Sequence, residues 1–257
     1  MDRLELERRF HDRQAARRAM ALGDKGDAWR VDAEAYLHHE SWVRPALARL
    51  GPLTGRRVLD YGCGHGMAAV VLAHWGATVT ALDIAAGYLA EAQRRARANN
   101  VVIHCVQADA EALPFAAGAF EAIWGHAILH HLQIAQAAAE VARVLRPGGV
   151  AVFCEPWGGN PLLEAARRYL PYPGKDRTPD ERPLTRGRLK PLYRHFEQVS
   201  LEGFQLLSWV GRLGYLPGLK VLRAVEEWVL HRYPTWHNWC RYVVITCRKG
   251  PNPVSDR

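Results

Sequence analysis

The chain has 257 residues, of which 49% are hydrophobic, and a formal net charge of +8 at pH 7. This length and composition suffice for one domain with a sizeable core, whereas no apolar run is long enough to span a bilayer and the N-terminus lacks the apolar core of a signal peptide. The five cysteines form no C-x-x-C pair, so we expect a reduced, cytoplasmic protein. The basic charge suggests either an anionic partner, such as a phosphorylated substrate, RNA or a membrane surface, or simply a solvated arginine-rich surface.

Residues 1–50 are predicted to form about two helices ahead of the first strand. In the segment EAYLHHESWVRPALARL, residues 34–50, apolar positions recur at helical spacing. A helical segment in this place can form a lid over a pocket. Tyr36, His39 and Glu40 are then available to close over a ligand, although the same residues are equally compatible with an exposed helix surface.

Short apolar runs alternate with helical segments through the middle of the chain. Gly76 and the Pro147-Gly148-Gly149 turn are signals that end the helices before them. Strict alternation of strand and helix predicts right-handed crossovers and an α/β fold, with a parallel sheet covered by helices on both faces. The predicted strands are RRVLD (56–60), TVTALD (78–83), VVIHCVQAD (101–109), FEAIWG (120–125) and GVAVFCE (149–155).

The composition changes after the fifth predicted strand. Residues 156–192 are rich in proline and arginine, which predicts an irregular insertion over the ligand edge of the sheet. Two closing strands are expected at 196–204 and 240–249, separated by one or two helices. The chain thus divides into an N-terminal helical lid (1–50), a core (51–155), the insertion (156–195) and a closing part of the same domain (196–250).

Three glycines follow the first predicted strand: Gly62, Gly64 and Gly66. In an open parallel sheet, ligands bind beyond the carboxyl ends of the strands, and glycine lets a ligand approach the main chain without meeting a Cβ atom. A dinucleotide fingerprint has the pattern G-x-G-x-x-G, but Met67 occupies its last position, so the spacing is wrong for NAD or FAD. An acid just before the turn, Asp60, suits a ligand that carries an ammonium group.

The acid that ends the second predicted strand, Asp83, is placed to accept hydrogen bonds from a ribose diol. Together the turn and the two acids favour an amino acid joined to a nucleoside.

In this region the chain resembles the class I S-adenosylmethionine (SAM)-dependent methyltransferases of the bacterial small-molecule type. The resemblance runs from about Arg56 to Glu155, and it is specific because several motifs occur in order: LDYGCGHG, ALDIA, QADAEALPFAAGAFEAIWGHAILHHL and EVARVLRPGGVAVF. It implies a Rossmann-like, seven-stranded, mostly parallel sheet of order 3-2-1-4-5-7-6 with an antiparallel seventh strand. It also implies SAM as the cofactor and S-adenosyl-L-homocysteine (SAH) as the product.

Carried over by position, the resemblance assigns the methionine and ribose ends of the cofactor. Asp60, Gly62 and Gly64 would line the methionine end, and Asp83 would hold the ribose hydroxyls.

The resemblance also assigns the adenine end and the neighbourhood of the sulfonium. Ile84 would pack on the adenine, Asp109 would accept from its amino group, and Ala110 would supply a backbone donor. His126 would lie near the methionine and the sulfonium, and Tyr36 is a further expected cofactor contact if the N-terminal helices form a lid.

Methyl transfer from a sulfonium is an in-line displacement in which positioning supplies most of the acceleration. A hydroxyl, thiol or protonated amine acceptor also needs a general base, whereas an amine lone pair or an electron-rich carbon needs none. His126 and His130 have the i, i+4 spacing of a metal pair, but no acid or cysteine completes a set, so no metal is expected. The candidate bases are His126, Glu155 and His130, with His131 and His39 as further possibilities.

The acceptor is expected to bind to the parts outside the common core, which are rich in aromatic residues. These residues suit a small aromatic, isoprenoid or lipid-like acceptor, unless they pack the lid onto the sheet. The arginines and lysines of the insertion suggest that the acceptor is anionic, or that the chain touches RNA or anionic lipid. An RNA-modifying methyltransferase and a non-catalytic SAM-binding protein are the alternatives. The accepting atom (O, N, C or S) stays open.

Overall fold

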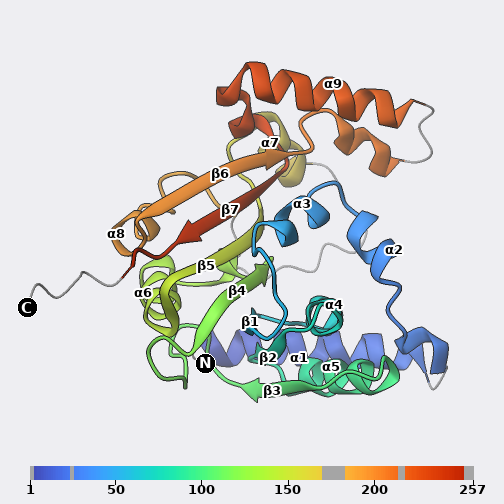
Figure 1. The fold of residues 1–257 in the computed structure, drawn as a ribbon. Helices are drawn as coiled ribbons and strands as arrows, with labels where there is room; N and C mark the ends of the chain where they lie inside the picture. Colours follow the sequence, from blue (N-terminus) through green and yellow to red (C-terminus); the bar gives the residue numbers. More distant parts are fainter. Residues whose placement is uncertain (1–2, 24–25, 170–182, 214–217, 252–257) are drawn as a thin grey trace, which may run out of the picture.

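A single seven-stranded sheet organises the protein (Figure 1). The computed structural model describes residues 3–23, 26–169, 183–213 and 218–251. The sheet has the order β3-β2-β1-β4-β5-β7-β6; β1 to β5 pair in parallel, and β7 is antiparallel to β5 and β6. This confirms the predicted strand order. The strands are β1 (Arg57–Tyr61), β2 (Thr78–Asp83), β3 (Ile103–Gln107), β4 (Phe120–His126), β5 (Leu145–Pro156), β6 (Gln198–Phe204) and β7 (Tyr242–Arg248).

Helices cover both faces of this sheet, as predicted, because alternate strand residues point into two separate apolar cores. One core joins the face that carries Val58 and Val79 to α3, α4 and α5, and the other joins the face that carries Leu59 and Tyr61 to α6 and α8. The α-helices are α1 (Arg3–Leu22), α2 (Ala33–His38), α3 (Val43–Ala48), α4 (Met67–His74), α5 (Ala86–Ala98), α6 (Ile134–Val144), α7 (Pro161–Tyr169), α8 (Leu192–His195) and α9 (Leu219–Arg232). The 3-10 helices are η1 (Gly26–Trp29), η2 (Leu129–His131), η3 (Ser208–Leu213) and η4 (Pro234–Trp239).

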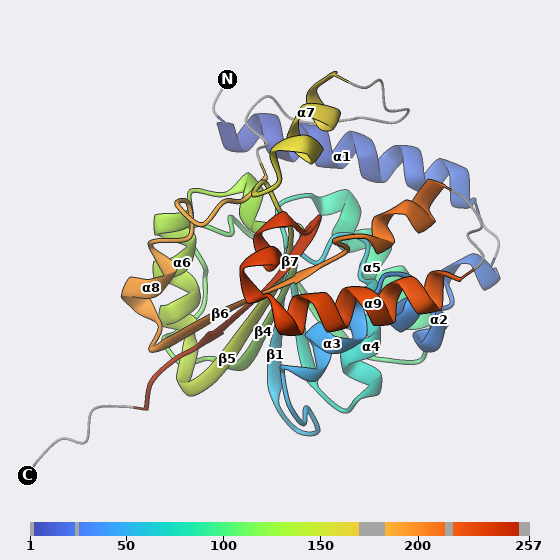
Figure 2. The same ribbon diagram turned by 90° about the horizontal axis from the view of Figure 1, so that it is seen from above.

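The first helix, α1, packs against α5 outside the sheet (Figure 2). Ala15 forms a small buried cluster with Ala85 and Tyr88. Polar contacts fix the same interface, since Arg18 pairs with Glu91 at 3.2 Å and Asp12 accepts a hydrogen bond from the backbone of α5. The N-terminal helix is therefore attached to the second βα unit rather than to the first strand that follows it.

The fifth strand begins earlier than the sequence predicts. Leu145 already pairs with Phe120, and regular pairing resumes at Val150 opposite Ala122. The residues between them form a bulge, in which Gly148 adopts a φ of +70°. The proline and glycines that end α6 therefore lie inside the strand.

The predicted insertion contains regular structure in its described part. The nine-residue helix α7 follows β5, and Trp157 forms a β-bridge with Leu184. Residues 170–182 of this predicted segment lie outside the described residues. Among the described helices, none combines the length and the apolar character needed to cross a membrane.

Candidate active site

A cavity of about 800 Å³ lies at the carboxyl ends of β1, β2 and β4, where an open parallel sheet binds its ligands. Its floor is formed by the strand ends and the loops that follow them, and its remaining walls come from α1, the α2 segment and the first turns of α4 and α5. Among the predicted site residues, the wall contains Tyr36, Asp60, Gly62, Gly64, Asp83, Ile84, Asp109, Ala110 and His126.

The three glycines of the turn have different reasons for lacking a side chain. All have positive φ, at +72° for Gly62, +50° for Gly64 and +77° for Gly66. A Cβ on Gly62 would lie 2.8 Å from Ile128, and one on Gly66 would lie 2.6 Å from Ala92 of α5. A Cβ on Gly64 would meet no atom within 4 Å. Gly62 and Gly66 thus permit close packing, whereas Gly64 faces open space in the cavity wall.

Asp60 is a buried carboxylate at the end of β1, only 2% exposed. Its Oδ2 atom has no hydrogen-bond partner among the described residues. Burial, with the charge of Asp83 nearby, raises the pKa of Asp60 to about 7, although a backbone hydrogen bond from Ala69 opposes this shift. A cationic ligand group beside Oδ2 would satisfy the oxygen and stabilise its charge.

Asp83, at the end of β2, holds the glycine turn in place. Its two oxygens accept hydrogen bonds from the backbone N–H groups of Gly64 and Ala85, both at 2.9 Å. Burial raises its pKa, while these backbone donors favour the charged form. A carboxylate has about four acceptor positions, so capacity remains for ligand hydroxyl groups.

The loop after β3 forms the opposite end of the cavity. Asp109 and Ala110 of this loop line the wall, as does Ile84, which directly follows β2. Asp109 accepts a hydrogen bond from the backbone N–H of Glu111 at 2.8 Å, and the Ala110 carbonyl accepts from the Tyr61 hydroxyl at 2.6 Å. These bonds fix the loop. They engage Oδ1 of Asp109 and do not involve its Oδ2.

His126 ends β4 and lies in the wall together with Tyr36 and His39 of the α2 segment. Its ring packs on buried Trp42, with the centroids 4.7 Å apart, and Trp42 in turn stacks on Tyr242 of β7. Burial lowers the pKa of His126 to about 4. The imidazole is therefore neutral at pH 7 and able to accept a proton.

Glu155 and His130, the other two candidate bases, do not belong to the cavity wall. Glu155 is fully buried, and its Oε1 accepts hydrogen bonds from the backbone N–H groups of Ile128 and Leu129, at 2.9 and 2.8 Å. Its Oε2 lies 2.7 Å from His130 Nδ1. Both side chains are thus engaged in fixing the segment after β4 in which Ala127 adopts a φ of +55°.

The sequence analysis did not single out the residues that α1 contributes to the wall. They recur every three or four positions and therefore lie on one helix face. That periodicity identifies one face of the helix, but it does not show that this face lines the cavity. They are Arg3, Leu4, Glu7, Phe10, His11 and Gln14.

Comparisons with known proteins identify the family of the central part of the chain. The family described as "Methyltransferase domain" matches residues 59–153. Malonyl-[acyl-carrier protein] O-methyltransferase from Enterobacter lignolyticus is 42% identical over 120 residues, which are 45% of this chain and 46% of that protein. An uncharacterised protein from Mycobacterium tuberculosis is 34% identical over 171 residues, 64% of this chain and 60% of that protein. The chain spans about half the length of the curated relatives it matches.

A solved structure agrees with the fold. Geranyl diphosphate C-methyltransferase from Streptomyces coelicolor has a TM-score of 0.56 and 17% sequence identity, covering 84% of this chain and 82% of that one. At this identity the likeness concerns the fold alone.

The sheet order agrees with the Rossmann-like methyltransferase fold, and the glycine turn and the two acids lie where such a fold binds its ligand. Residues 59–153 of this chain form a methyltransferase domain of the class I, SAM-dependent type. Its own residues fit that cofactor, because the buried Oδ2 of Asp60 requires a cationic partner and the space at Gly64 lets a ligand reach the backbone.

We predict that Gly64→Ala mainly affects SAM binding, whereas Gly66→Ala mainly affects stability. Gly64→Ala should weaken SAM binding at least tenfold, because the new methyl group enters ligand space, at a stability cost of about 1–2 kcal/mol for its positive φ. Gly66→Ala should instead lower the free energy of unfolding by about 2–4 kcal/mol, because its Cβ collides with α5. Calorimetric titration and denaturant unfolding measure the two effects. Unchanged SAM affinity in Gly64→Ala would place the cofactor elsewhere.

We also predict that SAM affinity depends on the protonation of Asp60. The pKa of this carboxyl is about 7 without ligand, and a cationic ligand group favours the charged form. Binding therefore releases a proton below pH 7, and affinity should be about tenfold lower at pH 6 than at pH 8. Calorimetry across this range gives the profile.

Asp60→Asn is the matched control for this profile. His11 has a raised pKa and lines the same cavity, so it titrates in both proteins, and the difference between the two profiles isolates Asp60. Parallel profiles would contradict the predicted role of this carboxylate.

Proposed function

We propose that this methyltransferase acts on a small, uncharged acceptor with an apolar body, and that His126 takes up the acceptor's proton. The observation that carries the proposal is the charge of the cavity wall. Among the described residues, five acids line it, namely Glu7, Asp32, Asp60, Asp83 and Asp109, against one arginine, Arg3. The guanidinium of Arg3 is itself paired with Glu111 at 2.6 Å.

An acidic wall favours a cationic cofactor and opposes an anionic acceptor. The described basic side chains of the predicted insertion do not contribute to this wall; Arg186 and Lys190, for example, are exposed. Lys175, Arg177 and Arg182, which the expectation of an anionic acceptor also used, lie outside the described residues. The proposal therefore concerns a neutral nucleophile, a hydroxyl or an amine.

The apolar part of the wall supports an acceptor with an apolar body. Aromatic and aliphatic side chains alternate there with the acids, and a large, mainly apolar cavity with a few polar groups is typical of a small-molecule site. They include Leu4, Phe10, Tyr36, Met67, Trp124, Ile128 and Leu132. The tryptophans of the C-terminal helices do not contribute to the wall; Trp228, Trp236 and Trp239 are exposed.

When bound, SAM supplies a methyl group that is already activated for displacement. His126 would accept the proton of a hydroxyl acceptor as the new bond to carbon forms. An imidazole with a pKa of about 4 costs about 4 kcal/mol to protonate at pH 7. That cost falls during the reaction, since His126 gains its positive charge as the cofactor's positive charge is lost and the total charge in the cavity stays constant.

Incubation of the purified protein with methyl-labelled SAM and an extract of its source cells tests the acceptor class. We expect label in the organic-soluble fraction, with little label after the same incubation of Asp83→Ala, in which loss of the expected ribose contacts weakens cofactor binding by about 1–3 kcal/mol. Label in RNA or protein would replace the small acceptor by a macromolecule. SAM binding without any labelled product would favour a non-catalytic binding protein.

With the labelled product identified, His126→Gln tests the base. We expect kcat to fall by about 10²–10⁴ while SAM affinity is retained, since the change removes proton transfer and not charge at the acids. His74→Gln is a matched control, because this exposed histidine ends α4 outside the cavity wall. Normal turnover in His126→Gln would indicate transfer to an amine lone pair, without a base.

A further inference from the structure

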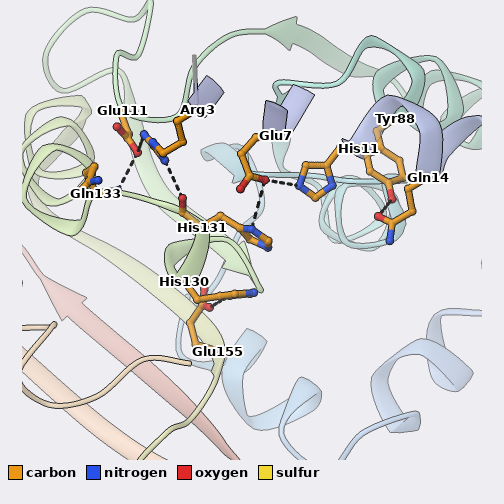
Figure 3. Close-up of polar contacts among 10 residues, drawn as sticks. All are labelled: Arg3, Glu7, His11, Gln14, Tyr88, Glu111, His130, His131, Gln133 and Glu155. Carbon is orange, nitrogen blue, oxygen red and sulfur yellow. Dashed lines mark hydrogen bonds and ion pairs between the residues drawn. The ribbon is translucent and has the colours of Figure 1, made fainter. Parts of the chain in front are cut away.

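Two histidines and a glutamate from distant parts of the chain meet in the cavity wall (Figure 3). Glu7 and His11 lie one turn apart on α1, and His131 ends η2 after β4. Each offers a ligand atom, and these three atoms all lie within 4.8 Å of one another. Figure 3 shows both imidazoles directed at the carboxylate of Glu7.

The spacing of these atoms is compatible with metal coordination. Glu7 Oε2 is 3.3 Å from His11 Nε2 and 3.6 Å from His131 Nδ1, and the longer distance exceeds that of a hydrogen bond. In a tetrahedral site with metal–ligand bonds of about 2.0–2.1 Å, neighbouring donors are separated by about 3.3–3.4 Å. The two measured separations therefore differ from this value by no more than a few tenths of an ångström.

A second observation points to a ligand at this place. The Nδ1 atom of His131 is buried and has no hydrogen-bond partner among the described residues. A buried polar nitrogen without a partner destabilises the folded state unless something binds it. A cation between His131 and Glu7 would remove this cost.

Neighbouring contacts orient the His11 side chain and hold the backbone at His131. Gln14 hydrogen-bonds to His11, and the Gln14 carbonyl accepts from the Tyr88 hydroxyl at 2.6 Å. Arg3 donates to the backbone carbonyl of His131 at 3.0 Å, so α1 is joined to the η2 segment beside the cluster. Supporting contacts of this kind orient metal ligands and tune their basicity.

We propose that Glu7, His11 and His131 bind a divalent transition-metal ion, with Zn²⁺ best suited to two imidazoles and one carboxylate with a position left open. The ion would join α1 to the core and so hold one wall of the cofactor cavity. The sequence-based expectation of no metal considered a different pair, His126 and His130. The cluster proposed here instead combines His131 with Glu7 and His11 of α1, which lie more than 100 positions away in the sequence.

Titration of metal-free, tag-free protein with Co²⁺ tests this site without relying on activity. We expect one equivalent to bind, with the visible absorption of four-coordinate Co²⁺ and displacement by one equivalent of Zn²⁺. His11→Gln and His131→Gln should each weaken binding at least a hundredfold, whereas His104→Gln, which changes an exposed histidine on β3, should bind as the parent chain does.

Zn²⁺ should also raise the unfolding temperature of the parent chain and of His104→Gln, but not that of the two cluster variants. Circular dichroism identifies a variant that has failed to fold. In that case the Co²⁺ stoichiometry and the absorption spectrum of the parent chain alone test the proposal. Failure of the parent chain to bind one equivalent would overturn the proposal, as would unchanged binding in folded His11→Gln or His131→Gln.

Discussion

Asp60 and Asp83 bury two carboxyl groups at the ends of adjacent parallel strands, and the site is built around this pair. Neither carboxylate has an ion-pair partner among the described side chains, so the fold stabilises them with backbone N–H groups. One of those donors is Gly64 of the glycine turn. The hydrogen bond from Gly64 to Asp83 therefore links the shape of the turn to the charge of the site. Because buried like charges raise each other's pKa, a cationic group bound beside the two acids would favour their charged forms.

Buried glutamates organise the segments around this centre in a comparable way. Glu155 binds the backbone after β4, and Glu226 of α9 accepts hydrogen bonds from the backbone N–H groups of Gln205, Leu207 and Ser208. Each carboxylate satisfies N–H groups that an irregular segment leaves without regular partners. An acid at a strand end is thus as suited to fixing a loop as to catalysis. Backbone N–H groups bind one oxygen of Glu155 and His130 binds the other, and Glu155 does not line the cavity.

The sequence was sufficient to predict the sheet and to bring the expected cofactor residues together in one cavity. Alternating apolar runs and helices determine a parallel sheet by physical rules, and the positions of Asp60, Gly64 and Asp83 follow from where β1 and β2 end. The strand order came from the family resemblance. The early start of β5 escaped prediction, because a bulge around Gly148 allows a helix-ending sequence to remain in the sheet.

The contribution of α1 escaped prediction for a different reason. Its polar face shows helical spacing, but its place against α5 depends on tertiary contacts such as Arg18 with Glu91. No local pattern reports a partner that lies more than 70 positions along the chain. The separate uses of the three glycines were hidden for the same reason, since only the packing of Ile128 and Ala92 distinguishes them.

The acidic wall has a consequence for the end of each catalytic cycle. SAM and SAH share an ammonium group, a carboxylate and an adenosine, and they differ in the positive charge on sulfur. The described residues of the wall include five acids and one arginine, so with the cofactor in this cavity their charge would favour the sulfonium of SAM over the neutral sulfur of SAH.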